Sequence, residues 1–370
     1  MSKRPRAPKK AGGLSPMRRL MIMLLSAVAT LAVAGMLVAV WVAWSFQGPG
    51  PTAKSGDMTT VMLRHGSSLP EIASTLSHEG VIRSAPIFVA AAQVTGAARR
   101  LKAGEYEFAS RASMASILAD IRDGKIIRHQ ITIPEGRTSE MVVEALAAKS
   151  DLTGVAAAPP EGSILPETYQ YERGEDRSAV LRRMMDARDQ LISSLWAKRQ
   201  PDLPFSTPEE AITLASIVEK ETGQASERPR VAAVFINRLR QGMRLQSDPT
   251  IIYGITQGRP LGRGIRASEL AAETPYNTYA INGLPPTPIA NPGRAAIAAV
   301  LDPPKTTELY FVADGTGGHV FASTLAEHNA NVAKWRAIER TRGAAPAVAS
   351  DGPGLAGDTP VDAPAVTVEP

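Results

Sequence analysis

Residues 20–44 form an uninterrupted apolar run, and this run restricts the fold of the chain more than any other feature. Its twenty-five residues carry no charge. As a helix rising about 1.5 Å per residue, they cover a hydrocarbon core of roughly 30 Å. Trp41 and Trp44 lie at the far end of the run, where interfacial aromatic residues are common. We therefore predict a transmembrane helix over residues 20–44.

Positive charge precedes the apolar run and predicts its orientation. Seven Lys and Arg residues lie before Leu20, and the first acidic residue is Asp57. The positive-inside rule places residues 1–19 in the cytoplasm as a basic stub and everything after the run outside. A cleaved signal peptide is the alternative, but its apolar region would normally be shorter, and no A-x-A site directly follows this one. We expect an uncleaved, single-pass anchor.

The formal net charge of +5 belongs to that stub. Without its seven cations, 34 basic residues face 36 acidic ones, so we predict no nucleic-acid surface. The absence of cysteine excludes thiol catalysis and cysteine-ligated metals. Five histidines are scattered without ligand spacing, and no phosphate-binding or dinucleotide-binding glycine motif is present. We expect neither a metal nor another cofactor.

An internal repeat organises the region beyond the run. Residues 45–56 are rich in Gly and Pro and predict a linker. The pattern of residues 61–76 recurs at 131–146, and each copy predicts a strand, a glycine turn, a capping hydroxyl and an amphipathic helix. Such a unit resembles half of a LysM module, a small fold that binds N-acetylated sugars, although any two strand–turn–helix units share this pattern. We predict a small α/β module over 57–130, an α+β domain over 131–340 and a disordered tail over 341–370, where periodicity ends.

Two carboxylates in an apolar helix are the strongest candidates for chemistry. A capping box at Thr207 and Glu210 predicts the start of this helix, and Glu219 and Glu221 lie near its end. At 100° per residue, Glu221 falls nearer the centre of the apolar arc than Glu219, while Lys220 points away. Burial raises the pKa of a carboxyl group, as a general acid near neutral pH requires. Glutamates at a helix end can equally serve solubility alone.

Two polar clusters follow that helix along the chain. Their amide, hydroxyl and carboxylate groups suit a polymer rich in amides and hydroxyls, and tyrosine rings can stack on sugars. The same residue types also build turns, so either role is open for each position. The candidate binding residues are Gln246, Asp248, Thr250, Tyr253, Tyr276, Asn277, Tyr279 and Asn282.

Seven stretches in order resemble one known family, the endolytic murein transglycosylases. The resemblance covers about residues 57–339, and the stretches that carry it read EGSILPETY, ASIVEKETG, VFINRL, MRLQSDPTIIYG, TPYNTY, INGLPPTPIANPG and LYFVADGTGGHVF. The resemblance implies an α+β protein with an N-terminal transmembrane helix, a LysM-like module and a catalytic domain with a lysozyme-like catalytic helix. It implies that one glutamate is the acid and base of the reaction. The Glu-Thr pair at Glu221 favours that residue, with Glu219 in reserve.

The resemblance also implies a substrate, a product and a location. The substrate would be the nascent peptidoglycan glycan strand, cut within its length to leave a 1,6-anhydro-muramyl end and so limit strand elongation. The enzyme would lie in the bacterial inner membrane with its catalytic domain in the periplasm, near peptidoglycan synthases (penicillin-binding proteins) as partners. A hydrolytic muramidase and a non-catalytic peptidoglycan-binding scaffold are the alternatives.

Overall fold

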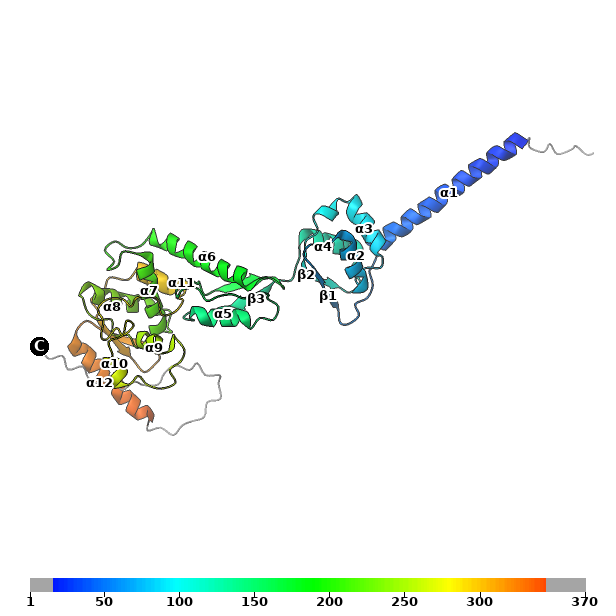
Figure 1. Ribbon diagram of the computed structural model, residues 1–370. Coiled ribbons are helices and arrows are strands. Elements are labelled where there is room, and N and C mark those ends of the chain that lie inside the picture. Colours follow the sequence, from blue (N-terminus) through cyan, green and yellow to red (C-terminus); the bar gives the residue numbers. More distant parts are fainter. Residues whose placement is uncertain (1–15, 344–370) are drawn as a thin grey trace, which may run out of the picture. The chain divides into compact units, whose positions relative to one another are not determined.

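The computed structural model describes residues 16–343, so most of the predicted tail and most of the predicted basic stub lie outside the described residues. The first three residues of the predicted disordered tail, 341–343, are instead the end of a helix. The chain divides into two compact units, Met1–Arg128 and His129–Pro370 (Figure 1). Both contain helices and strands, and the mixed α+β class predicted from the sequence is confirmed. The elements of the first unit are α1 (Pro16–Gln47), β1 (Met58–Leu63), α2 (Leu69–His78), α3 (Ala85–Val94), the 3-10 turn η1 (Ala97–Arg99), β2 (Gly104–Ala109) and α4 (Met114–Asp123).

The apolar run forms the long helix α1. Over Met17–Gln47 its mean hydropathy is 2.4 and its side chains are almost all exposed, so it is long and apolar enough to cross a membrane. A membrane anchor and an N-terminal signal sequence share these properties. The helix continues three residues past Trp44 into the predicted linker, because the first helix-breaking residues are Gly48 and Pro49.

A two-stranded antiparallel sheet and three short helices complete the first unit. Met58 of β1 faces Ala109 of β2, and the register continues to Leu63 and Gly104. The predicted strand–turn–helix pattern is confirmed here, because Gly66 between β1 and α2 takes a positive φ of 81°. One hydrophobic core collects side chains from both strands and from α2, α3 and α4, among them Val61, Leu76, Phe88, Tyr106 and Ile117.

The second unit is mostly helical. Its elements are β3 (His129–Thr132), α5 (Ser139–Ala147), β4 (Thr168–Tyr171), α6 (Arg177–Trp196), α7 (Pro208–Glu221), α8 (Arg228–Arg240), α9 (Asp248–Thr256), α10 (Ala267–Ala271), α11 (Arg294–Leu301), β5 (Tyr310–Ala313), β6 (His319–Ala322) and α12 (Leu325–Gly343).

The second copy of the repeat opens this unit. β3 leads through Gly136, at a φ of 75°, to Thr138, whose hydroxyl accepts a hydrogen bond from the backbone of Met141 at the start of α5. β3 pairs antiparallel with β4, and a small core beneath them joins α5 to the first half of α6. The predicted strand, glycine turn, cap and helix are therefore confirmed in this copy too.

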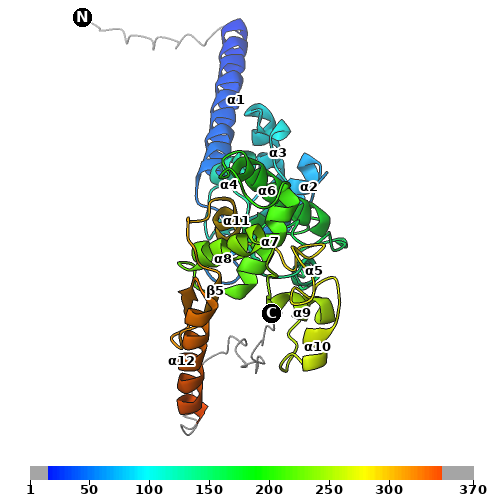
Figure 2. The same cartoon turned by 90° about the vertical axis from the view of Figure 1, so that its left-hand side faces the viewer.

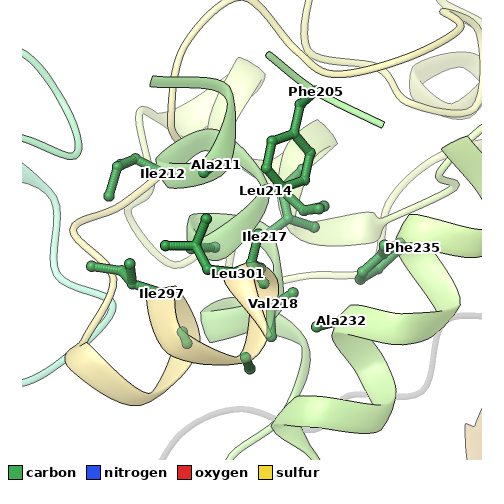
Figure 3. Packing of buried hydrophobic residues seen from close by; sticks show 14 of the residues in the cluster. Phe205, Ala211, Ile212, Leu214, Ile217, Val218, Ala232, Phe235, Ile297 and Leu301 are labelled. Carbon is green, nitrogen blue, oxygen red and sulfur yellow. The ribbon is translucent and has the colours of Figure 1, made fainter. Parts of the chain in front are cut away.

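Helix α7 lies at the centre of the larger core. Eight consecutive residues, 211–218, are buried, and α7 packs against both α8 and α11 (Figures 2 and 3). Leu214, Ile217 and Val218 contribute to the cluster on the α7 side, and Phe235 does so from α8. A helix buried on nearly all sides cannot rotate, so the direction of each side chain at its C-terminal end is set by this packing.

A short hairpin is seated beside α8. β5 and β6 pair antiparallel, with Tyr310 facing Ala322 and Ala313 facing His319. Phe311 lies edge-on to Phe235 of α8, and the Arg230 guanidinium lies over the Phe321 ring at 4.1 Å. An isolated two-stranded hairpin is marginal in water, so these contacts stabilise it.

Candidate active site

Glu221 is the last residue of α7, at the edge of the core. The predicted capping box starts the helix: Thr207 N–H donates to Glu210 Oε2 at 3.0 Å, and Glu210 N–H donates to Thr207 Oγ1 at 3.2 Å. The helix ends because Thr222 adopts extended backbone, with φ −137° and ψ 129°. The side chain of Glu221 is therefore projected from a rigid element and remains half-buried.

One hydrogen bond orients the Glu221 carboxyl group. Ser247 Oγ donates to Glu221 Oε1 at 2.5 Å. Burial, assisted by the nearby charge of Asp248, raises the pKa of Glu221 to about 7, while the Ser247 bond and the Arg238 charge oppose this increase. Because Oε1 accepts the Ser247 hydrogen, the proton of the acid form lies on Oε2. Near neutral pH this group can both give and take a proton.

Glu219 is placed differently, although it is only two residues away. Its Oε1 accepts from Arg228 Nη2 at 2.9 Å, and its Oε2 accepts from the Gly293 backbone N–H at 2.9 Å. The side chain is only 4% exposed, and Arg228 also pairs with Glu135 at 2.9 Å. Burial raises the pKa of Glu219, but both of its oxygens are engaged by protein donors. Glu219 therefore links α7 to two neighbouring segments and has no oxygen free for a substrate.

A second carboxylate and a buried cation lie near Glu221. Tyr279 Oη donates to Asp248 Oδ1 at 2.6 Å, and burial raises the pKa of Asp248. Arg238 is 8% exposed and donates to the Leu309 carbonyl at 2.7 Å, the Leu245 carbonyl at 2.8 Å and Gln246 Oε1 at 3.2 Å. The guanidinium thus holds the segment that leads into Ser247.

Ser247 and Arg238 are the site residues that the sequence did not single out. Both lie inside stretches that were recognised, since Ser247 is flanked by the candidates Gln246 and Asp248, and Arg238 belongs to VFINRL. Their signal was weak because a serine before Asp-Pro predicts only a helix cap, and an arginine near a helix end predicts only a favourable dipole contact.

Three of the predicted binding residues are buried. Thr250 and Asn277 are 0% exposed and Tyr253 is 6% exposed. Thr250 Oγ1 donates to the Ser247 carbonyl at 2.7 Å, and Asn277 Nδ2 donates to the Ala272 carbonyl at 2.6 Å. The polar groups of Thr250 and Asn277 thus satisfy backbone carbonyls of neighbouring segments. The turn role that the sequence left open fits Asn277, whereas Thr250 lies in the first turn of α9.

The remaining predicted binding residues fall into two groups. Gln246, Asp248 and Tyr279 are half-buried and belong to the network around Glu221. Tyr276 lies edge-on to Tyr253 with ring centroids 5.0 Å apart, and its hydroxyl is 2.8 Å from Thr287 Oγ1. Asn282 is exposed on the following loop. Across residues 16–343, no group of three or more His, Asp or Glu side chains is arranged to hold a metal ion.

Comparison with known proteins finds relatives across most of this chain. The profile of the YceG-like family matches residues 61–334. An endolytic murein transglycosylase of Streptococcus pneumoniae is 30% identical over 332 residues, covering 76% of this chain and 59% of the relative. Another, from Bacillus subtilis, is 28% identical over 313 residues, covering 75% of this chain and 85% of the relative. This chain thus spans less than two thirds of the pneumococcal protein.

A solved structure is also similar. The crystal structure of a YceG-like protein from Listeria monocytogenes aligns with a TM-score of 0.47 and 28% sequence identity. The alignment covers 75% of this chain and 99% of the Listeria chain.

Proposed function

This chain belongs to the YceG-like family, and from that premise we propose that it is an endolytic lytic transglycosylase of peptidoglycan. The observation that carries the proposal is Glu221, one half-buried carboxyl group with a pKa raised to about 7. Its Oε1 is held by Ser247, which leaves Oε2 for the substrate. Relatives named endolytic murein transglycosylases support the same reaction class.

A single carboxyl group can perform both proton transfers of this reaction. Glu221 Oε2 gives its proton to the glycosidic oxygen between N-acetylmuramic acid and N-acetylglucosamine, and the C1–O bond breaks. The resulting Glu221 carboxylate then takes the proton of the 6-hydroxyl of the same muramic acid, whose oxygen bonds to C1. The product is a 1,6-anhydro end, and Glu221 regains its proton. Because the nucleophile is part of the substrate, its effective concentration is high.

Hydrolysis is the second candidate, and Asp248 is the observation that favours it. Its charge lies close enough to raise the pKa of Glu221, so two carboxyl groups share this site. A muramidase needs such a second group to activate a water molecule. However, Asp248 already accepts the Tyr279 hydroxyl hydrogen, which reduces its strength as a base.

We place Gln246, Asp248 and Tyr279 beside the bond that is cut, with Tyr276 and Asn282 farther along the polymer. These side chains offer donors, acceptors and aromatic faces to a glycan. Thr250, Tyr253 and Asn277 hold this wall from behind.

We further propose that α1 anchors the protein in the bacterial inner membrane, with its N-terminus in the cytoplasm and both units in the periplasm. The lysines and arginines before Leu20 support that orientation. The first unit, with its antiparallel β1–β2 pair and flanking helices, would act as a LysM-like module that positions the enzyme on glycan. Peptidoglycan synthases would supply the nascent strands.

Mass spectrometry of a peptidoglycan digest tests the proposed reaction. Detergent-solubilised wild type should release fragments with anhydro ends, and Glu221→Gln should release none. Hydrated ends, heavier by one water, would assign the chain to the muramidases. No fragments from folded wild type on either purified sacculi or membrane-bound nascent strands would make it a glycan-binding protein.

A further inference from the structure

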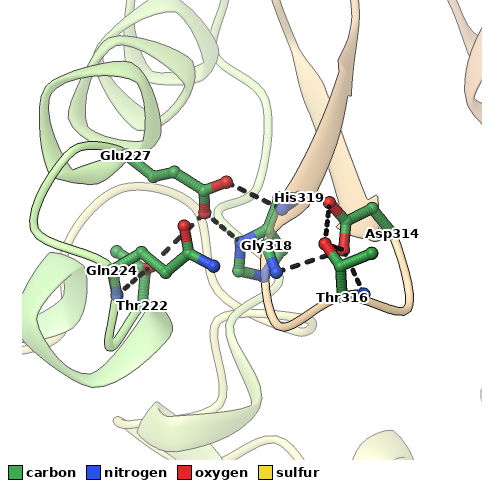
Figure 4. A network of polar contacts seen from close by, with 7 residues as sticks. All are labelled: Thr222, Gln224, Glu227, Asp314, Thr316, Gly318 and His319. Atoms are coloured by element: carbon green, nitrogen blue, oxygen red, sulfur yellow. Dashed lines mark hydrogen bonds and ion pairs between the residues drawn. The ribbon is translucent and has the colours of Figure 1, made fainter.

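The turn that follows Glu221 is joined to the β5–β6 hairpin by one half-buried carboxylate. Glu227 Oε1 accepts the backbone N–H of His319 at 2.8 Å, and Glu227 Oε2 lies 2.7 Å from His319 Nδ1 (Figure 4). Thr222, the residue directly after Glu221, donates its hydroxyl to the same Oε2 at 3.5 Å. The two side chains of the pair are 16% and 18% exposed.

The tip of the hairpin is built to hold this arrangement. The backbone N–H groups of Thr316 and Gly318 donate to Asp314 Oδ1 at 2.6 and 3.1 Å, and Asp314 N–H donates to the Gly318 carbonyl at 2.8 Å. A Cβ at Gly318 would lie 2.8 Å from Glu227 Oε1, so a larger residue there would displace the Glu227 carboxylate. Gly317 takes a positive φ of 92°, a conformation that favours glycine.

The Glu227 carboxylate determines which nitrogen of His319 carries the proton. A carboxylate accepts only, so Nδ1 is the donor in this bond, and Nε2 of the neutral ring is an acceptor. No hydrogen bond of Nε2 to another described residue is present, and Nε2 is not one of the fully buried, unpaired polar atoms of residues 16–343, although the His319 side chain as a whole is only 18% exposed. Phe311 lies edge-on to the ring at 5.3 Å and limits its rotation. The imidazole is thus fixed at one nitrogen and open at the other.

We propose that His319 is a substrate-binding residue whose Nε2 accepts a hydrogen bond from a sugar hydroxyl of the glycan, and that Glu227 is its positioning residue. The inference rests on the function proposed above, and it assigns part of the binding site to the β5–β6 hairpin. A ring serving only to attach the hairpin would need Nδ1 but not Nε2. Holding one nitrogen with a carboxylate while exposing the other is the arrangement by which proteins orient histidines toward ligands.

Two substitutions separate attachment of the hairpin through Nδ1 from substrate binding through Nε2, because Asn and Gln carry an amide at different distances from Cβ. His319→Asn keeps an N–H donor near the position of Nδ1 and has no atom at Nε2. His319→Gln reaches the position of Nε2 but loses the donor to Glu227. Both variants are uncharged and polar, so each controls for the other.

The experiment uses the full chain in detergent, with thermal melting and the kinetics of glycan cleavage measured for both variants. His319→Asn should melt within a few degrees of wild type yet lose about tenfold in kcat/KM, the loss expected for one hydrogen bond to substrate. His319→Gln should retain more activity than His319→Asn at a temperature where both are folded. Wild-type kcat/KM in folded His319→Asn would overturn the proposal. If His319→Asn does not fold, His319→Ala takes its place: wild-type kcat/KM in the folded variant would overturn the proposal, and a loss of about tenfold or more in kcat/KM would support it.

A binding measurement on a variant that cannot cleave tests the role of His319 independently of the proposed transglycosylase reaction. In the Glu221→Gln background, purified uncrosslinked glycan strands should bind about tenfold more weakly when His319→Asn is added. Unchanged affinity would overturn the role of His319 even if wild type cleaves. Weaker affinity would support it even if the reaction proves to be hydrolysis.

Discussion

Glu219 and Glu221 differ by two residues and therefore by about 200° around helix α7. That rotation points Glu219 toward Arg228 and the Gly293 backbone, and Glu221 toward Ser247. One carboxylate is saturated by charged and backbone donors, whereas the other keeps one oxygen free at the surface of the core. The difference in partners, rather than in chemical type, makes Glu221 the candidate acid.

Replacing each glutamate in turn tests this distinction. Glu221→Gln should lower kcat for glycan cleavage by at least 10²–10⁴-fold, the usual contribution of a general acid, without unfolding the protein. Glu219→Gln should keep measurable activity but melt at a lower temperature, because buried Arg228 loses a charged partner. Cleavage assays and thermal melts of both variants check this. The assignment would be contradicted if Glu219→Gln abolished cleavage and Glu221→Gln only lowered the melting temperature.

The rate should depend on pH through Glu221, which must be protonated to act first as an acid. We expect kcat/KM to fall as pH rises above about 7, the pKa given by burial. Ser247→Ala removes a bond that stabilises the carboxylate, so the falling limb should move to higher pH by roughly one unit. Asp248→Asn removes a negative charge and should move it to lower pH. Shifts of the same sign in both pH–rate profiles would contradict this account.

The raised pKa of Glu221 also makes the stability of the folded protein depend on pH. Between 4.5, the ordinary value, and about 7, the folded state holds a proton on Glu221 that the unfolded state releases. The free energy of unfolding therefore decreases as pH rises through this window. Glu221→Gln removes the effect, so the variant should melt above wild type at pH 8, with a smaller difference at pH 4. A difference independent of pH would show that Glu221 is not desolvated.

At the scale of elements, the capping box at the first turn of α7 stabilises the helix in addition to its core packing. The reciprocal bonds of Thr207 and Glu210 satisfy backbone donors that would otherwise be unpaired. Thr207→Ala should cost about 1 kcal/mol in the free energy of unfolding, measured by chemical denaturation, while activity at low temperature is kept. Glu210→Gln preserves the acceptor and serves as the control. An equal loss in both variants would indicate that charge, not capping, stabilises this end.

At the scale of the whole molecule, α1 and the first unit are joined without a break at Trp44. Ser45 is buried and Phe46 packs against the core of the first unit, so a soluble form should begin at Ser45 rather than after the helix ends at Gln47. Deleting residues 2–44 should move the protein from the membrane fraction to the soluble fraction and leave its cleavage of purified peptidoglycan unchanged. Fractionation and the digest together test this. If the truncated protein remained in the membrane fraction, a surface other than α1 would have to bind the membrane.

Much of the fold was predictable because its signals are local. The apolar run, the glycine turns at Gly66 and Gly136, and the caps of α5 and α7 each depend on residues a few positions apart. Helical spacing also placed Glu221 closer to the core than Lys220, and Lys220 is exposed. Continuous hydropathy and short-range hydrogen bonds are properties of the chain itself, so the sequence by itself determined these elements.

The environment of each polar group was decided only by the tertiary structure. The bonds that define the site join residues far apart: 26 positions separate Ser247 from Glu221, 31 separate Tyr279 from Asp248, and 92 separate His319 from Glu227. Composition could not distinguish a buried asparagine that braces a loop from an exposed one whose amide remains accessible, as Asn277 and Asn282 demonstrate. Burial and partner are outcomes of packing between distant segments, and they set which carboxyl group holds a proton and which side chain remains free to bind.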